Sequence, residues 1–140
     1  MKTRFLVVPA LLLSGTALAV KPDKPGCTDH PLFPTRMPAY RIETCELKEF
    51  ASYDFLVTKG PRRTVEGKLT FLTYAVDDRK DDRSGLEVVR NYENALKKVG
   101  GTVQASDPQR FVNGTVVVDG REVWAEALKG NGKIWLSPIT

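Results

Sequence analysis

The chain has 140 residues, of which 21 are Lys or Arg and 17 are Asp or Glu. Lys2 and Arg4 lie in an N-terminal segment that we expect to be cleaved, which leaves 19 basic and 17 acidic residues and a net charge of +2. This near balance removes the compositional argument for a nucleic-acid partner, which depends on a clustered basic excess. The expected mature chain suits one ordinary domain.

Residues 1–19 have the layout of a secretory signal peptide. A basic start is followed by an apolar run over residues 5–13 and by the small residues Ala17-Leu18-Ala19. The apolar run is too short to span a bilayer, which needs about 20 apolar residues. We therefore predict cleavage after Ala19 and an exported chain with no transmembrane segment. It would reside in the periplasm, be associated with the outer membrane, or be secreted.

Residues 20–39 form a proline-rich segment with five prolines. Proline fixes φ and removes a backbone donor, so we predict an extended arm that lies across the domain. Cys27 and Cys45 are the only cysteines and are predicted to pair in an oxidising compartment. The bond would stabilise the fold by about 3 kcal/mol. The alternative is a buried free thiol at Cys45 with Cys27 in a mobile tail.

The first strands are predicted from alternating apolar and polar residues. Residues 40–44 and 53–57 each alternate over a short stretch, and residues 64–76 alternate over a longer one. A turn at residues 59–62 precedes the longer segment, which predicts a hairpin.

One helix follows a charged loop. Ser84 is the predicted N-cap, and Glu87 completes a capping box. Gly100 and Gly101 are predicted to end the helix. Between these two ends, residues at helical spacing should face the core: Leu86, Val89, Tyr92 or Glu93, Leu96 and Val99.

The remaining chain reads as β-structure. Residues 102–105 form one strand, and three hairpin-type dipeptides follow, Asn113-Gly114, Asp119-Gly120 and Asn131-Gly132. They divide the tail into an antiparallel meander. The predicted class is therefore α+β, with a curved antiparallel sheet and one helix packed on a face, in a single domain over residues 40–140.

Catalytic and metal-binding motifs are absent from the sequence. His30 is the only histidine and is expected to be a surface or capping residue, so a Ser-His-Asp triad and a zinc site lack their residues. We predict no catalytic residue, no metal and no cofactor. The enzymatic alternative is a small secreted hydrolase that uses two carboxylates of the sheet.

Polar residues at a turn and on the helix form a possible contact surface. They could bind an envelope partner, or they could be ordinary solvated residues. The candidates are Lys59, Arg62, Arg63, Arg90, Asn91 and Asn94.

Two stretches resemble a known family. Residues 29–42 read Asp-His-Pro-Leu-Phe-Pro-Thr-Arg-Met-Pro-Ala-Tyr-Arg-Ile, and residues 86–101 read Leu-Glu-Val-Val-Arg-Asn-Tyr-Glu-Asn-Ala-Leu-Lys-Lys-Val-Gly-Gly. They resemble the N-terminal accessory region of bacterial OmpA-family envelope proteins, and the likeness extends over most of the mature chain. The resemblance implies a Gram-negative periplasm or outer-membrane association and supplies no catalytic residue. Those proteins continue into a peptidoglycan-binding domain, so we expect here the accessory module alone.

The sequence thus favours a non-catalytic binding or scaffolding module of the cell envelope. Its partner would be an envelope protein, a lipid or a glycan. Besides the hydrolase, the other alternative is a secreted inhibitor or effector that uses the arm as its recognition segment.

Overall fold

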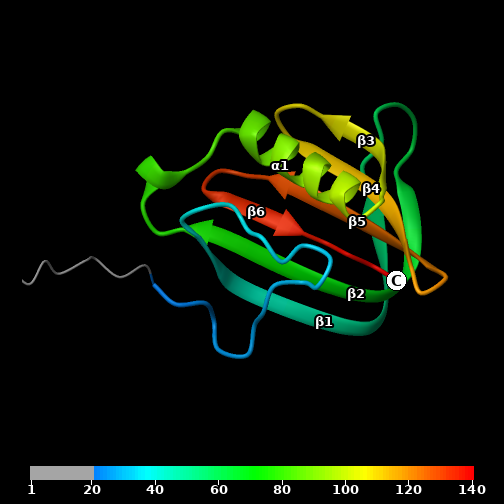
Figure 1. The fold of residues 1–140 in the computed structure, drawn as a ribbon, viewed down its shortest axis with the longest axis horizontal. Helices are drawn as coiled ribbons and strands as arrows, with labels where there is room; N and C mark the ends of the chain where they lie inside the picture. The colour runs from blue at the N-terminus through cyan, green and yellow to red at the C-terminus, as the bar shows by residue number, and fades with distance from the viewer. Residues whose placement is uncertain (1–20) are drawn as a thin grey trace, which may run out of the picture.

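The computed structural model describes residues 21–140, so the signal peptide predicted for residues 1–19 lies outside the described residues. Six strands form one antiparallel sheet in the order β1-β2-β6-β5-β4-β3, and the helix α1 lies on one face of it (Figure 1). This architecture confirms the predicted α+β class with a curved antiparallel sheet. The elements are β1 (Tyr40–Phe55), β2 (Arg63–Val76), the 3-10 turn η1 (Arg79–Asp81), α1 (Gly85–Lys98), β3 (Thr102–Asp107), β4 (Phe111–Val118), β5 (Arg121–Lys129) and β6 (Lys133–Leu136).

Strand β1 is longer than predicted, because the two expected strands are one. Its residues 46–50 are exposed at the edge of the sheet, and a bulge lies between Lys48 and Ala51. The bulge interrupts the alternation of side chains although pairing with β2 continues, which explains why the pattern alone suggested a break. Beyond the bulge β1 curves over the sheet (Figure 1), and the ring of Phe55 packs 5.3 Å from that of Trp124.

Two of the three hairpin dipeptides are turns, and the third is not. Asp119-Gly120 joins β4 to β5 with both residues at positive φ, and Gly132 has positive φ between β5 and β6. Asn113-Gly114 instead lies inside β4, so the prediction of a turn at these residues is wrong. Gly114 runs beneath α1, where an added Cβ would lie 3.0 Å from Cδ1 of Leu96 and 2.4 Å from the Thr102 carbonyl oxygen.

Both ends of α1 are capped by the predicted residues, but the hydrogen bonds of the described residues include only one of the two that define the predicted capping box, and the Glu87 carboxylate accepts from Arg83. The Ser84 hydroxyl accepts the Glu87 N–H, and the N–H groups of Gly100 and Gly101 donate to the carbonyls of Lys97 and Leu96. The buried face consists of Val88, Val89, Tyr92 and Leu96.

The predicted core face of α1 is wrong at two positions. Leu86 and Val99, which had been expected inside, are each 37% exposed. The stripe that packs on the sheet runs through Val88, Tyr92 and Leu96, which are four residues apart, and Leu86 lies beside it around the helix. Val99 is exposed for another reason, because it is the C-cap residue just beyond the last turn of α1.

The sheet buries apolar residues on both faces. Ala125 and Ala127 of β5 pack in the main core with α1 and residues 32–37 of the arm, whereas their neighbour Trp124 packs with Phe55, Leu69 and Ile139. Alternating side chains of a strand point to opposite faces, so the curved end of β1 and the helix cover opposite sides of β5.

Candidate functional site

The arm is fixed to the sheet by a disulfide and by buried apolar side chains. Cys27 is bonded to Cys45 of β1, as predicted, with 5.8 Å between their Cα atoms. Phe33 and Met37 are 3% and 4% exposed and belong to the core cluster that contains Tyr92 of α1. The arm is therefore a fixed part of the helix-covered face, where it lies beside α1 and across β6 and β2 (Figure 1).

A second fastening of the arm is a charged network around Arg36. Its guanidinium donates to both carboxylate oxygens of Asp23 over 2.6 and 2.8 Å and to Asp29 over 2.8 Å. Asp29 also accepts the Tyr74 hydroxyl over 2.7 Å, which ties the network to β2. Arg36 holds the pKa of Asp23 below its ordinary value. The sequence did not predict this network, because an extended segment without a periodic pattern gives no rule for pairing residues that are 7 and 13 positions apart.

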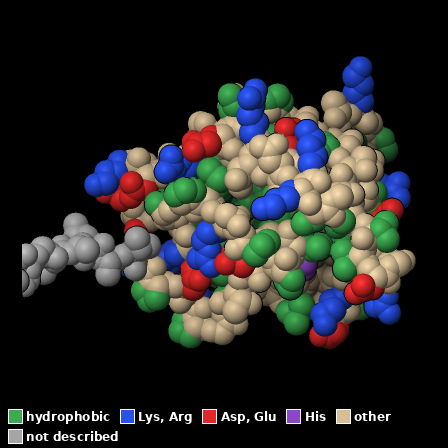
Figure 2. Space-filling model, in the orientation of Figure 1, with side chains coloured by type: hydrophobic (Ala, Val, Ile, Leu, Met, Phe, Trp, Pro, Cys, Tyr) green, Lys and Arg blue, Asp and Glu red, His purple; other side chains and the backbone are tan. Residues whose placement is uncertain are grey.

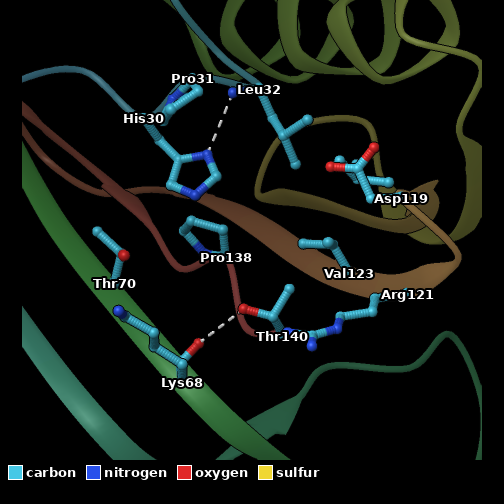
Figure 3. A pocket seen from close by; sticks show the side chains of 11 residues that line it. His30, Pro31, Leu32, Lys68, Thr70, Asp119, Arg121, Val123, Pro138 and Thr140 are labelled. Carbon is cyan, nitrogen blue, oxygen red and sulfur yellow. Dashed lines mark hydrogen bonds between the residues drawn. The ribbon is translucent and has the colours of Figure 1, made fainter.

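A hollow of about 590 Å³ opens on one side of the arm. Its wall comes from the arm, from β2, from the β4–β5 hairpin and from the last residues of the chain. Figure 3 shows the His30 ring above Pro138 and the Arg121 side chain reaching toward Thr140 from the hairpin. The lining residues are His30, Pro31, Leu32, Lys68, Thr70, Val118, Asp119, Arg121, Val123, Pro138 and Thr140.

His30 has a defined protonation state in this hollow. Its Nδ1 accepts the backbone N–H of Leu32 over 3.2 Å, so the proton of the neutral ring lies on Nε2. Burial lowers the pKa of His30, which favours this neutral form. The sequence suggested a surface or capping role for His30; in the structure its ring bonds to the backbone of the arm and lines the hollow.

A second hollow, of about 390 Å³, lies on the other side of the arm against α1. Asn91 and Asn94, two of the predicted contact residues, line it together with Lys98 from the same helix face. Pro31 and Leu32 border both hollows, so the two lie next to each other on either side of these arm residues. We call the two hollows together the arm trough.

The other predicted contact residues lie elsewhere. Arg90 is exposed on α1 outside both hollows, and Lys59 and Arg62 are exposed in the β1–β2 turn. Arg63 begins β2, with its guanidinium 4.8 Å from the centre of the Trp124 ring. The candidate set therefore divides into two separate places. On the face drawn in Figure 2, Lys and Arg side chains stand singly or beside acidic ones and form no continuous basic surface.

A buried carboxylate cluster on the opposite face was not predicted. Glu126 is 2% exposed, and its oxygens accept the Tyr53 hydroxyl at 3.0 Å, the Leu56 N–H at 2.9 Å and Nδ2 of Asn113 at 3.0 Å. Desolvation raises the pKa of Tyr53 to about 12. The only sequence signal was an acid amid the apolar residues of β5. Because both oxygens are occupied and enclosed, the cluster fastens the end of β1 to the sheet rather than meeting a substrate.

Two further observations concern the part of the chain that the structure describes. Residues 21–140 contain no group of three or more His, Cys, Asp or Glu side chains placed to hold a metal ion. Over the same residues, no helix has both the length and the apolar character that crossing a bilayer requires.

Comparison with known proteins adds no assignment to this geometry. No model of a known protein family matches the chain, and no curated protein matches it. The resemblance to OmpA-family accessory regions therefore stays a prediction.

Proposed function

We propose that this protein is an exported, non-catalytic binding module of the bacterial cell envelope that contacts its partner through the arm trough. One observation carries the proposal: a covalently fixed arm stands between hollows of about 590 and 390 Å³, and Pro31 and Leu32 line both of them. Hollows of about 300–1,000 Å³ are typical of ligand sites.

The fastening of the arm supports a binding role. The Cys27–Cys45 bond and the Arg36 network hold the trough in one shape before any partner arrives. A site that is already ordered loses less conformational entropy on binding than a flexible segment does. The amides of Asn91 and Asn94 add hydrogen-bonding groups to its apolar wall.

Export and envelope location are supported by three features. The signal-peptide layout of residues 1–19 directs secretion, and a disulfide persists in oxidising compartments such as the periplasm. The resemblance of residues 29–42 and 86–101 to OmpA-family proteins favours the Gram-negative envelope. An envelope protein, a lipid or a glycan is the corresponding partner.

The trough is less suited to the hydrolase alternative. Asp119 is the one acidic side chain among the residues that line the two hollows, whereas glycoside hydrolysis uses a pair. The buried Glu126 has its oxygens occupied by three donors.

Co-sedimentation with three envelope preparations tests the proposal. The purified mature protein is mixed with phosphatidylethanolamine–phosphatidylglycerol vesicles, with peptidoglycan sacculi, or with outer-membrane fragments. Asn94→Trp fills the second hollow, and Lys97→Trp places the same ring on α1 outside it. We expect at least one preparation to retain the protein and Lys97→Trp, but to release Asn94→Trp. If no preparation retains the native protein, or if Asn94→Trp and Lys97→Trp are retained equally, the proposal is overturned.

A further inference from the structure

The hollow beside His30 has a chemical character that specifies its ligand more closely. We infer that it binds an amphipathic carboxylate, which is an apolar body carrying one carboxylate group. This inference rests on the proposed function, because it names the ligand chemistry of one half of the arm trough.

Two donors from different elements face this hollow. The His30 ring lies above Pro138, and its Nε2 carries the proton because Nδ1 accepts the Leu32 N–H (Figure 3). Arg121, at the start of β5, extends its guanidinium toward Thr140 on the other side (Figure 3). None of the ion pairs found among residues 21–140 involves Arg121. A guanidinium presents parallel N–H donors that match the two oxygens of a carboxylate.

Apolar side chains supply the rest of the wall. Leu32 enters from the arm, Val123 from β5, and Pro138 from the segment after β6 (Figure 3). Burying apolar surface of a ligand against them yields about 25 cal/mol for each Å² removed from water. The volume of about 590 Å³ accommodates an apolar body larger than a free acetate or phosphate ion. The ligand is therefore amphipathic rather than a bare inorganic ion.

The charges of the lining favour one negative charge over two. Lys68 is paired with Glu49 across 3.5 Å, which leaves Arg121 as the cation without a carboxylate partner in the lining. Asp119 contributes a negative charge near Leu32 and opposes a second charge on the ligand (Figure 3). A dianionic phosphate would meet more repulsion here than a carboxylate does.

Calorimetric titration at pH 7.5 tests the ligand class with three probes. Octanoate has the carboxylate and the chain, octanol has the chain alone, and acetate has the carboxylate alone. We expect octanoate to bind about tenfold or more tightly than either. Octanol lacks the charge-assisted contact, and acetate lacks the buried apolar chain. Equal binding of octanol and octanoate would overturn the inference, because the hollow would then be a simple apolar site.

Variants assign the site to Arg121. Arg121→Gln should weaken octanoate binding about tenfold and leave octanol unchanged, and Arg121→Lys should give an intermediate loss because it keeps the charge but not the fork. Arg110→Gln removes an exposed arginine from the β3–β4 turn and serves as the matched control. Unchanged octanoate affinity in Arg121→Gln, with the circular dichroism of the native protein, would refute the assignment.

Two further comparisons distinguish the source of the ligand and show which of the two proposals fails. Vesicles with and without oleate show whether the carboxylate is taken from a lipid surface, whereas octanoate tests the free form; binding of either supports the inference, and binding of neither overturns it. If octanoate fails but Asn94→Trp still abolishes envelope retention, the inference falls and the proposed function stands. If octanoate binds but no envelope preparation does, the proposed function falls instead.

Discussion

The Arg36 guanidinium donates hydrogen bonds to both carboxylate oxygens of Asp23, at 2.6 and 2.8 Å, and the same carboxylate accepts the backbone N–H of Ile42 at 2.7 Å. One carboxylate therefore joins the two ends of the arm to each other and to the first strand. Together with the disulfide, this contact gives the trough its fixed wall.

Replacing Arg36 should loosen that wall. Arg36→Gln leaves Asp23 and Asp29 without their cation, and we expect the free energy of unfolding to fall by about 1.5–3 kcal/mol, the range for hydrogen bonds to charged groups. The Arg36 and Asp23 side chains are about one-quarter to one-third exposed, so we expect a loss in the lower half of that range. Urea unfolding measures the loss, and Arg110→Gln is the control. Equal stability of the two variants would mean that the network does not hold the arm.

The same network sets an acid limit on stability. Because Arg36 lowers the pKa of Asp23 in the folded chain, Asp23 contributes stability above its ordinary pKa and loses it as the pH falls through the lowered value. Unfolding between pH 6 and about pH 2 should therefore show a decline that is smaller in Asp23→Asn. Parallel curves for the two proteins would contradict this account.

Glu126 should be among the least replaceable residues of the sheet. Glu126→Ala strips the acceptor from Tyr53, Leu56 and Asn113 at once, and an unpaired buried donor costs about 1–3 kcal/mol. We expect a loss of about 3 kcal/mol or more in urea unfolding. Glu66→Ala, at an exposed position of β2, should change stability by about 0.5 kcal/mol or less. A small loss at Glu126 would show that β1 is held by apolar packing alone.

Tyr40 and Tyr53 should make the protein sensitive to alkali. Burial raises the pKa of each to about 12, so their contribution to stability is complete below about pH 10 and is lost as the pH rises through 12. Thermal unfolding between pH 9 and 12 should decline less steeply in Tyr53→Phe than in the native chain. A decline that is identical in both would contradict the assigned pKa of Tyr53.

Gly114 should tolerate no larger residue. Its added Cβ would lie 2.4 Å from a backbone oxygen of Thr102, which no side-chain movement relieves. We expect Gly114→Ala to cost about 1–3 kcal/mol of unfolding free energy, the range for overpacking. Val117→Ala, at a position of β4 that is 68% exposed, is the comparison that should change little. A neutral Gly114→Ala would show that α1 and β3 can separate without loss.

The sequence predicted the features that depend on neighbouring residues. Ser84 bonds to Glu87 within the first turn of α1, and Gly100 bonds to Lys97 at its last turn. Asp119-Gly120 forms its own hairpin turn, so local patterns were sufficient for α1 and for the β4–β5 turn. The cysteine pairing was predictable because only two cysteines exist.

What the sequence missed depends on distant partners. Asn113-Gly114 has the composition of a turn, but Asn113 bonds to Glu126 and to the Leu56 carbonyl, which keeps it within β4. Nothing near Arg36 in the chain identified Asp23 as its partner, and nothing near His30 placed it opposite Arg121. The trough was likewise unpredictable, because the arm, α1 and the β4–β5 hairpin meet only in the folded chain.

The most direct test of the account is an NMR titration of the ¹⁵N-labelled mature protein with the envelope preparation that it binds. If the arm trough is the contact surface, the largest changes should fall on the amides of Leu32, Asn94 and Arg121, on both sides of the arm. Changes centred instead on the β1–β2 turn at Lys59 and Arg62, with the arm unaffected, would contradict it. The second result would move the binding surface to the other half of the residues that the sequence had suggested.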